Sequence, residues 1–278
     1  RWRTATQDFA ADTVHSPTID AGDPTEAFGS ELANNGGRVN QGSYGNTAEA
    51  SKSAPPPTSP TLWFVAMSSA GLNYGTVGAE GYVVQASSKA DFTGTLYSSI
   101  TWAQAAQLAP DALDPNTTYY LRAGALWNNT TVYSPTVIST ATLAQLVVGT
   151  TVYQINVTSM VVNWLPLPAD VSSNSSSGYL MQVSTRSDFT PLWTTPSSAT
   201  PNVALSTLTA GGLYGDATYY FRVGSLNWNG VPNFATSVST FMPLVLSMSL
   251  SPTTYAFGSI PVATSTNGYT SLTIANEG

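Results

Sequence analysis

A stretch in which apolar and polar residues alternate occurs twice in this 278-residue chain. The first copy, LDPNTTYYLRAGALWN, spans Leu113–Asn128, and the second, LYGDATYYFRVGSLNWN, spans Leu213–Asn229. From Tyr119 and from Tyr219 onward the alternation has a period of two, which predicts a strand with one buried face. The copies are separated by a whole domain length, so the repetition indicates duplicated domains rather than the short units of a solenoid.

Other strand-like segments surround each copy, with turn-forming residues between them. In the first repeat they are Leu62–Met67, Tyr82–Ser87, Thr118–Ala125 and Thr136–Thr142, and in the second they are Met160–Trp164, Tyr179–Ser184, Thr218–Ser225 and Ala235–Phe241. Only Thr101–Gln107 hints at a helical period. Short strands at regular spacing predict an all-β fold, with one antiparallel β-sandwich over residues 61–144 and another over 145–244.

The residues before each tyrosine pair resemble those of a known sandwich family. The pattern L-x-P-x-T-x-Y at Leu113–Tyr119 is similar to the approach to strand F in fibronectin type III domains. In the second copy Leu213 and Tyr219 keep the spacing, whereas Gly and Ala replace Pro and Thr. The resemblance implies tandem fibronectin III/Ig-like sandwiches in which Tyr119 is a tyrosine corner, whose hydroxyl bonds back to the backbone.

The same resemblance gives a role to a tryptophan. Trp164 stands where the family has its strand-B tryptophan, and Trp63 is a looser counterpart in the first repeat. On the repeated strand, two arginines occupy equivalent outward positions, and a glutamine on a neighbouring strand is the predicted cross-strand partner of each. The predicted pairs are Gln85 with Arg122 and Gln182 with Arg222.

Residues 1–54 differ from everything that follows them. The run Ile19–Ser53 is rich in Gly, Asn and Asp, and its apolar residues come singly, which favours short extended pieces joined by turns. It resembles the C-terminal end of bacterial right-handed parallel β-helix proteins, which implies an irregular β-helix cap over residues 1–54. The matching residues are Ile19, Asp20, Gly22, Asp23, Pro24, Gly36, Gly37, Arg38, Asn40, Gly42, Tyr44, Gly45, Thr47, Glu49, Ala50 and Ser51. The prolines that follow predict a semi-rigid linker over residues 55–60.

Residues 245–278 begin another unit. YAFGSIPVATST and YTSLTIANEG resemble the opening strands of immunoglobulin-like domains in choice-of-anchor and related surface proteins, and Tyr269–Ala275 alternates as a strand does. This segment is expected to be a partial Ig-like domain. At the other end, RWRTATQDF lacks the apolar core of a signal peptide, so the sequence is expected to start after processing or to be an excerpt from something longer.

Charged residues make up only 8% of the chain, and cysteine is absent. Disulfides, thiolate metal sites and cysteine nucleophiles are therefore excluded. The formal net charge is −7 and the eight Lys and Arg residues are not clustered, which argues against a nucleic-acid partner. No apolar run is long enough to span a membrane. A surface kept soluble by hydroxyl and amide groups is typical of exported β proteins, so an extracellular or cell-surface location is expected.

Catalytic motifs are lacking. His15 is the only histidine and no G-x-S-x-G motif is present, so neither enzymatic activity nor a cofactor is predicted. Asp20 and Asp23 are candidates for a Ca²⁺ site, because calcium prefers several oxygen ligands. They also flank Gly22 and precede a proline, which is turn chemistry, and no calcium-loop motif accompanies them. The turn is the preferred interpretation, and calcium binding stays the alternative.

The loop after each repeated strand carries aromatic residues. Trp127 with Tyr133, and Trp228 with Phe234, are candidate platforms on which a sugar ring stacks, with Asn side chains as donors. The alternative is that these aromatics complete the core at the end of each sandwich. Sequon-type triplets are expected to mark exposed loops if the protein is exported. They begin at Asn116, Asn128, Asn129, Asn156 and Asn174.

Together these features predict an extracellular structural or adhesive protein, such as a surface stalk or a filament subunit. Incomplete β-structure at both ends would pair with strands of neighbouring chains and give a homopolymer. The alternative is a non-catalytic accessory region of a secreted polysaccharide-degrading β-helix enzyme, which would bind cell-surface or environmental glycans.

Overall fold

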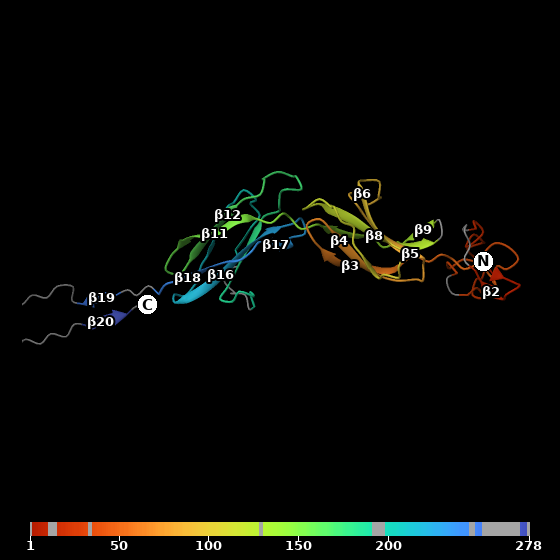
Figure 1. The fold of residues 1–278 in the computed structure, drawn as a ribbon, viewed down its shortest axis with the longest axis horizontal. Helices are drawn as coiled ribbons and strands as arrows, with labels where there is room; N and C mark the ends of the chain where they lie inside the picture. Colours follow the sequence, from red (N-terminus) through yellow and green to blue (C-terminus); the bar gives the residue numbers. More distant parts are fainter. Residues whose placement is uncertain are drawn as a thin grey trace, which may run out of the picture.

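The computed structural model describes residues 2–10, 16–32, 35–127, 130–190, 198–244, 248–251 and 273–276. In this part of the chain all regular structure is β, and every pair of hydrogen-bonded strands is antiparallel. The predicted all-β fold with tandem sandwiches is confirmed. Figure 1 shows the two sandwiches following one another along the long axis, with the N-terminal segment at one end.

The first sandwich consists of a small sheet and a larger one. The small sheet has the order β3–β4–β7, and the larger one has the order β10–β8–β5–β6, with β9 also paired to β8. The bounds are β3 Thr58–Val65, β4 Ala70–Gly75, β5 Gly81–Ser87, β6 Leu96–Thr101, β7 Gln107–Leu108, β8 Thr118–Trp127, β9 Thr130–Tyr133 and β10 Ile138–Ala141.

The second sandwich repeats this topology. Its small sheet has the order β11–β12–β15, and its larger sheet has the order β14–β13–β16–β17, with β18 also paired to β16. The bounds are β11 Val148–Ile155, β12 Met160–Leu165, β13 Tyr179–Ser184, β14 Ser198–Thr200, β15 Thr207–Ala210, β16 Ala217–Leu226, β17 Pro232–Phe234 and β18 Val238–Met242. The two copies of the repeated sequence are therefore β8 and β16, which lie within the larger sheets.

Each sandwich has its own hydrophobic core, and the repeated strand supplies much of it. Tyr119 and Tyr219 are each only 1% exposed. The Tyr119 hydroxyl accepts a hydrogen bond from the backbone N–H of Asp114 at 3.1 Å, and the Tyr219 hydroxyl accepts one from Tyr214 at 2.9 Å. This geometry confirms the predicted tyrosine corner in both repeats. Burial raises the pKa of Tyr119 to about 12.

The strand-B position is confirmed for Trp164 but not for Trp63. Trp164 in β12 is buried, and its ring lies 5.0 Å from that of Tyr179. Trp63 lies in β3 beside a register shift between Leu62 and Phe64, and it is 47% exposed. The true counterpart is Tyr74, which holds the same place in β4, and its ring centroid lies 5.3 Å from that of Tyr82. The prediction was wrong because the residues of β4, AGLNYG, are mostly small and two of them are glycines, so the sequence does not indicate a strand there.

The hydroxyl of Tyr74 predicts an unusual mutational result. It is buried without a hydrogen-bond partner among the described residues, and burial raises the Tyr74 pKa. The neighbouring Tyr82 hydroxyl accepts from the Val77 N–H at 2.8 Å and donates to Gln104 Oε1 at 3.2 Å. We expect Tyr74→Phe to leave the free energy of unfolding unchanged or to raise it by up to about 1 kcal/mol, whereas Tyr82→Phe lowers it by about 1–2 kcal/mol. Urea titrations of both variants test this, and equal losses would contradict it.

The helical hint at Thr101–Gln107 is wrong. Thr101 ends β6 and Gln107 begins β7, and the residues between them form bends and an irregular connection. Trp102, inside this connection, is 70% exposed. The apparent period of the apolar residues therefore reflects neither a helix nor a buried face.

The N-terminal segment is held together by polar groups. β1 (Trp2–Arg3) pairs with β2 (Asp8–Phe9), and the described residues from 16 to 53 form turns and bends without a strand. Asn40, which is 8% exposed, is at the centre: its side chain accepts from the Asp20 N–H at 2.6 Å and donates to the Ser51 carbonyl at 2.6 Å. The β-helix relationship of this segment stays a prediction.

In the C-terminal segment, β19 (Met248–Ser251) pairs with β20 (Thr273–Asn276). The other residues of the predicted partial Ig-like domain over 245–278 lie outside the described residues, so that assignment also stays a prediction.

Candidate functional site

An arginine on the outer face of the second sandwich is enclosed by two aromatic rings. The guanidinium carbon of Arg222 lies 4.2 Å from the ring centroids of both Phe189 and Phe234. Its Nε and Nη2 donate to Gln182 Oε1 at 2.8 and 2.6 Å, so the predicted cross-strand pair is confirmed. Burial lowers the pKa of Arg222, and the rings supply favourable cation–π contacts in place of water.

The first sandwich has the same arrangement. The guanidinium of Arg122 lies 3.9 Å from the ring centroid of Phe92 and 3.8 Å from that of Tyr133. Its Nε and Nη2 donate to Gln85 Oε1 at 2.9 and 2.8 Å. Each of the two predicted sugar-stacking pairs therefore contributes one ring, Tyr133 or Phe234, that lies against an arginine.

The sequence alone did not identify the second aromatic ring that lies against each arginine. Phe92 and Phe189 follow an aspartate that caps a tight turn, and both have left-handed backbone angles, with φ of 60° and 57°. A left-handed phenylalanine is unfavourable by itself, so its recurrence indicates that the ring is required over the arginine. The shared tripeptide Asp-Phe-Thr in both repeats was the available signal.

Trp127 binds the linker that precedes the first sandwich. Its Nε1 donates to the carbonyl of Pro55 at 3.1 Å, and its ring packs against the core of that sandwich. Tyr133 instead lies over Arg122 on the outer face, so the structure does not bring the first predicted pair together on one surface. In the second pair, Trp228 is 50% exposed on the turn between β16 and β17. Sugar binding at these residues stays a prediction.

The loop after β16 joins the two sandwiches through Asn227, which is only 1% exposed. Its Nδ2 donates to the carbonyls of Ala141 and Thr142, at 2.8 and 3.2 Å, where the first sandwich ends. Its Oδ1 accepts from the backbone N–H groups of Asn229 and Val231, at 3.0 and 2.9 Å, and thereby shapes the loop. All hydrogen-bonding groups of this side chain are used, either within the loop or across the junction.

Other amides extend the junction. Asn229 Oδ1 accepts from the N–H of Ala141 at 2.7 Å, and Asn233 Nδ2 donates to the carbonyl of Ala144 at 2.7 Å. From the first sandwich, Asn116 Nδ2 donates to the carbonyl of Ser175 at 3.1 Å. Asn116 is 2% exposed, so the expectation that its sequon marks an exposed loop was wrong: the residue faces the second sandwich rather than solvent. Asn156 and Asn174 are exposed, and Asn128 and Asn129 lie outside the described residues.

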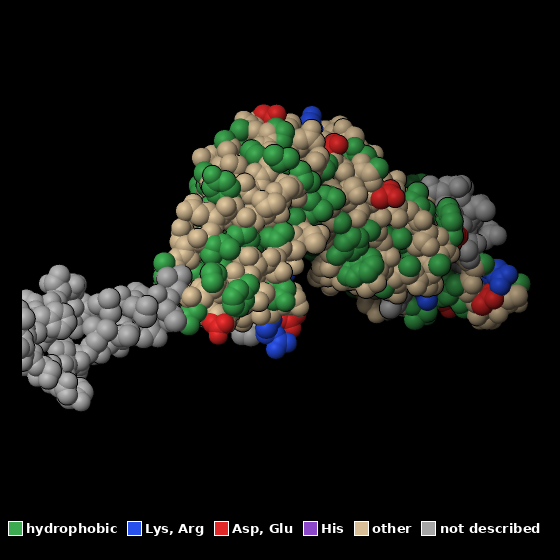
Figure 2. Space-filling model, turned by 60° about the vertical axis from the view of Figure 1, so that its left-hand side comes forward, with side chains coloured by type: hydrophobic (Ala, Val, Ile, Leu, Met, Phe, Trp, Pro, Cys, Tyr) green, Lys and Arg blue, Asp and Glu red, His purple; other side chains and the backbone are tan. Residues whose placement is uncertain are grey.

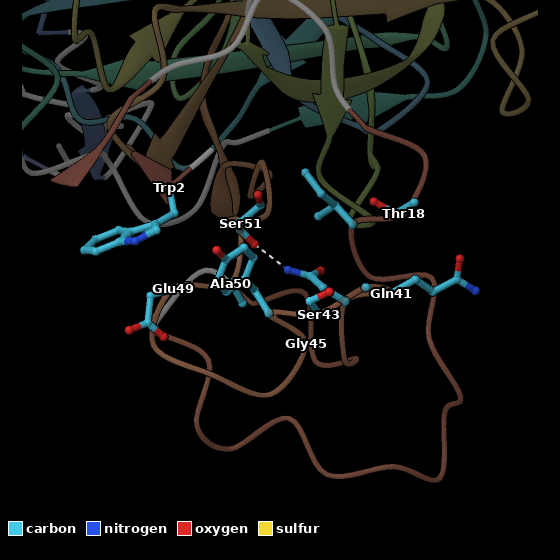
Figure 3. Close-up of a pocket in the computed structure, with 12 residues that line it drawn as sticks. Trp2, Thr18, Gln41, Ser43, Gly45, Glu49, Ala50 and Ser51 are labelled. Atoms are coloured by element: carbon cyan, nitrogen blue, oxygen red, sulfur yellow. Dashed lines mark hydrogen bonds between the residues drawn. The ribbon is translucent and has the colours of Figure 1, made fainter. Parts of the chain in front are cut away.

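A pocket of about 290 Å³ lies in the N-terminal segment, as Figure 3 shows. Trp2 and Glu49 project on the same side of it, whereas Gln41 points away and donates to the carbonyl of Ala21 at 2.8 Å. Tyr44, another lining residue, is 52% exposed. An aromatic ring beside a carboxylate and several amide or hydroxyl groups is suited to a small polar ligand.

The two candidate calcium ligands are engaged within this segment. Asp23 Oδ1 accepts from the backbone N–H and the hydroxyl of Thr25, at 2.8 and 2.7 Å, and these bonds lower the Asp23 pKa. Asp20 Oδ1 accepts from the Ser53 hydroxyl at 2.9 Å. Within the described ranges no three His, Cys, Asp or Glu side chains are grouped as a metal site would require. His15 lies outside those ranges, and calcium binding stays a prediction.

No protein-family model and no curated protein matches the chain. Similar solved structures include a segment of two fibronectin type III domains from chicken tenascin, which is 15% identical, with a TM-score of 0.37, and covers 67% of this chain and 100% of that one. The FN1–FN3 domains of chicken CNTN1 are 13% identical, with a TM-score of 0.36 and coverage of 69% of both chains. Over the described residues, no helix has the length and apolar character needed to cross a membrane.

Proposed function

We propose that this chain is part of an extracellular structural protein, a surface stalk or filament subunit, and that this part of it has no catalytic role. The observation that carries the proposal is the amide junction between the sandwiches. Asn227 is buried and bonds two carbonyls of the preceding sandwich, and Asn229, Asn233 and Asn116 add further bonds across the same boundary. A junction of this kind fixes the two modules in one orientation, which suits a spacer that must keep its length.

The first sandwich is held to the segment before it in a related way. Trp127 occupies the position after Leu126 that Asn227 occupies after Leu226, and its indole N–H bonds the linker carbonyl of Pro55. The end of each repeated strand therefore contacts the chain just before its own sandwich, through the last residue of β8 and the residue that follows β16. Contacts at matching places in both repeats, made by an indole in the first and by an amide in the second, support a rod of fixed length.

The surface is also consistent with this role. Acidic and basic side chains are sparse and scattered, and hydrophobic patches lie between polar ones, as Figure 2 shows for one face. Side chains without charge repel one another little, so neighbouring chains can pack closely. We propose that chains associate with one another through pairing of exposed β-strands.

Electron microscopy and small-angle X-ray scattering of the purified chain over a range of concentrations test the proposal. We expect extended particles whose two sandwiches keep one mutual orientation, and linear assemblies as concentration rises. Flexibly jointed monomers at every concentration would contradict it.

The alternative, an accessory region that binds glycans, is favoured by the N-terminal pocket with Trp2 and Tyr44 in its lining. Sugar rings commonly stack on such aromatic side chains. A glycan array probed with the wild-type chain and with Trp2→Ala and Trp228→Ala variants distinguishes the two functions. Binding that is lost in either variant would support the alternative.

A further inference from the structure

Strand β6 forms one edge of the larger sheet in the first sandwich, as Figure 1 shows, and its only strand partner in the described part of the chain is β5. Just before β6, the carbonyl of Thr95 accepts from the N–H of Ser88 at 3.1 Å, so the backbone groups of Thr95 face β5. In an antiparallel pair the direction alternates with each residue. The N–H and C=O groups of Leu96, Ser98 and Ile100 therefore point away from β5, toward the free edge.

This edge lacks the features that normally prevent pairing with another strand. The sequence has no charged residue between Asp91 and Asp111 and no proline until Pro110. The register with β5 is regular through all six residues of β6, without a bulge. Leu96 and Ile100 are 45% and 57% exposed. A regular, uncharged edge with exposed apolar side chains is a template for strand addition.

The corresponding edge of the second sandwich is different. There β14 has only three residues, Ser198–Thr200, and Pro201 follows it directly. The outer strands of the small sheets, β3 and β11, each contain two register shifts. Short strands, proline and bulges are the usual means of protecting an edge. Compared with these three edges, β6 combines length and regularity with an absence of protection.

We propose that β6 is a self-association site, at which a second copy of this chain pairs antiparallel with β6 about a two-fold axis through Ser98. In this register Leu96 pairs with the partner's Ile100, Ser98 with the partner's Ser98, and Ile100 with the partner's Leu96. All three residues present their free N–H and C=O groups to the same edge, so every pair is a hydrogen-bonded one.

The side chains are as self-complementary as the backbone. Leu96, Ser98 and Ile100 lie on one face of the sheet, because alternate residues of a strand point to the same side. The two-fold axis therefore places each leucine opposite an isoleucine, and the two serines opposite each other. Apolar cross-strand pairs stabilise a ladder, and no like charges oppose one another here. A second copy is the occupant that this symmetry favours, since Leu96 and Ile100 are equally spaced about Ser98.

The inference rests on the proposed structural function and adds a specific contact to it. A two-fold contact closes on itself and produces a dimer, whereas a filament needs a second, head-to-tail contact. The β6 pairing would therefore join two rods side by side. It can succeed or fail independently of end-to-end assembly.

Sedimentation equilibrium of the whole chain, with Ser98→Pro and Ser98→Lys variants, tests the pairing. Proline removes an N–H that faces the free edge and leaves the bonds to β5 in place, and lysine places two like charges opposite each other. We expect a wild-type dimer and at least about tenfold weaker dimerisation in both variants. Ser239→Lys, at an exposed position of β18, is the matched control and should dimerise like the wild type. Both Ser98 variants should unfold at the same urea concentration as the wild type, which shows that the weaker dimerisation does not come from unfolding.

Cross-linking supplies a second readout. The chain has no cysteine, so Ser98→Cys introduces a single thiol. Hydrogen-bonded antiparallel pairs have Cα atoms about 5.5 Å apart, within the range that a disulfide spans. Ser98→Cys should form a covalent dimer on oxidation, whereas Ser239→Cys should not. Filaments that persist in the Ser98 variants, with no dimer lost, would overturn the β6 contact but keep the proposed function. A wild type that stays monomeric would overturn the β6 contact, and it would overturn the proposed function as well only if its two sandwiches were flexibly jointed.

Discussion

Replacing Asn227 with leucine is expected to lower the free energy of unfolding of the second sandwich by about 3 kcal/mol. Leucine has the same branched arrangement of heavy atoms as asparagine but offers no polar atoms. Two carbonyls, of Ala141 and Thr142, and two N–H groups, of Asn229 and Val231, would lose their partner. Each buried polar group left unsatisfied costs about 1–3 kcal/mol, although the loop can relax and admit water, which reduces the sum.

The neighbouring Trp228 provides the control. It lies on the same turn and is 50% exposed, and Trp228→Ala should change stability by less than about 0.5 kcal/mol. Asn227→Asp separates the bonds that Asn227 makes within its loop from the bonds that it makes to the first sandwich. It keeps an acceptor for the loop N–H groups, but it directs a negative charge at two carbonyl oxygens.

The junction has a second measurable property, which is the orientation of the two sandwiches. If Asn227 holds them together, small-angle scattering of Asn227→Asp should show a broader range of particle dimensions than the wild type, under conditions where both remain folded. If Asn227→Asp scatters like the wild type, and Asn227→Leu loses little stability, then the remaining amides hold the junction without Asn227.

The strands that the sequence predicts best are those buried on at least one face along their length. β13 coincides with the predicted segment Tyr179–Ser184, and β5 begins one residue before the predicted one. The tyrosine corner was identifiable because it depends on a local spacing of five residues. Edge strands such as β6 and β7 escaped prediction because their pairing depends on neighbours distant in the sequence, and their own residues carry little apolar alternation.

The junction escaped prediction for a related reason. In LNWNGVPNF the sequence suggested a binding role for the aromatic residues. The contacts with the end of the first sandwich are instead made by the buried side-chain amide of Asn227 and by the amides of Asn229 and Asn233. Asparagine is common in surface turns, so its presence in a loop does not by itself indicate burial. Only the position of the first sandwich's last strand, β10, and of the residues after it shows that these amides face backbone N–H and carbonyl groups rather than solvent.

Replacing Arg222 with alanine is expected to lower the free energy of unfolding of the second sandwich by about 3 kcal/mol. The loss combines two cation–π contacts, worth about 0.5–2 kcal/mol each, with two hydrogen bonds to Gln182 and the packing of the arginine's aliphatic stem. It also removes the reason for the left-handed conformation of Phe189, a residue that is only 6% exposed in the intact sandwich.

Two measurements distinguish a planar stacked arginine from a simple positive charge. Arg222→Lys keeps the charge but loses the flat guanidinium and its paired donors, so we expect it to recover less than half of the lost stability. The groups that contact Arg222 are neutral, so the loss of stability in Arg222→Ala should change little between low and high salt, unlike the loss from an exposed ion pair.

The matched substitution Arg122→Ala should destabilise the first sandwich similarly, because Phe92 and Tyr133 enclose the arginine at comparable distances. Urea titrations at two salt concentrations measure all three effects. Full recovery by lysine, or a loss that disappears in high salt, would mean that the charge alone matters and that the rings merely lie nearby.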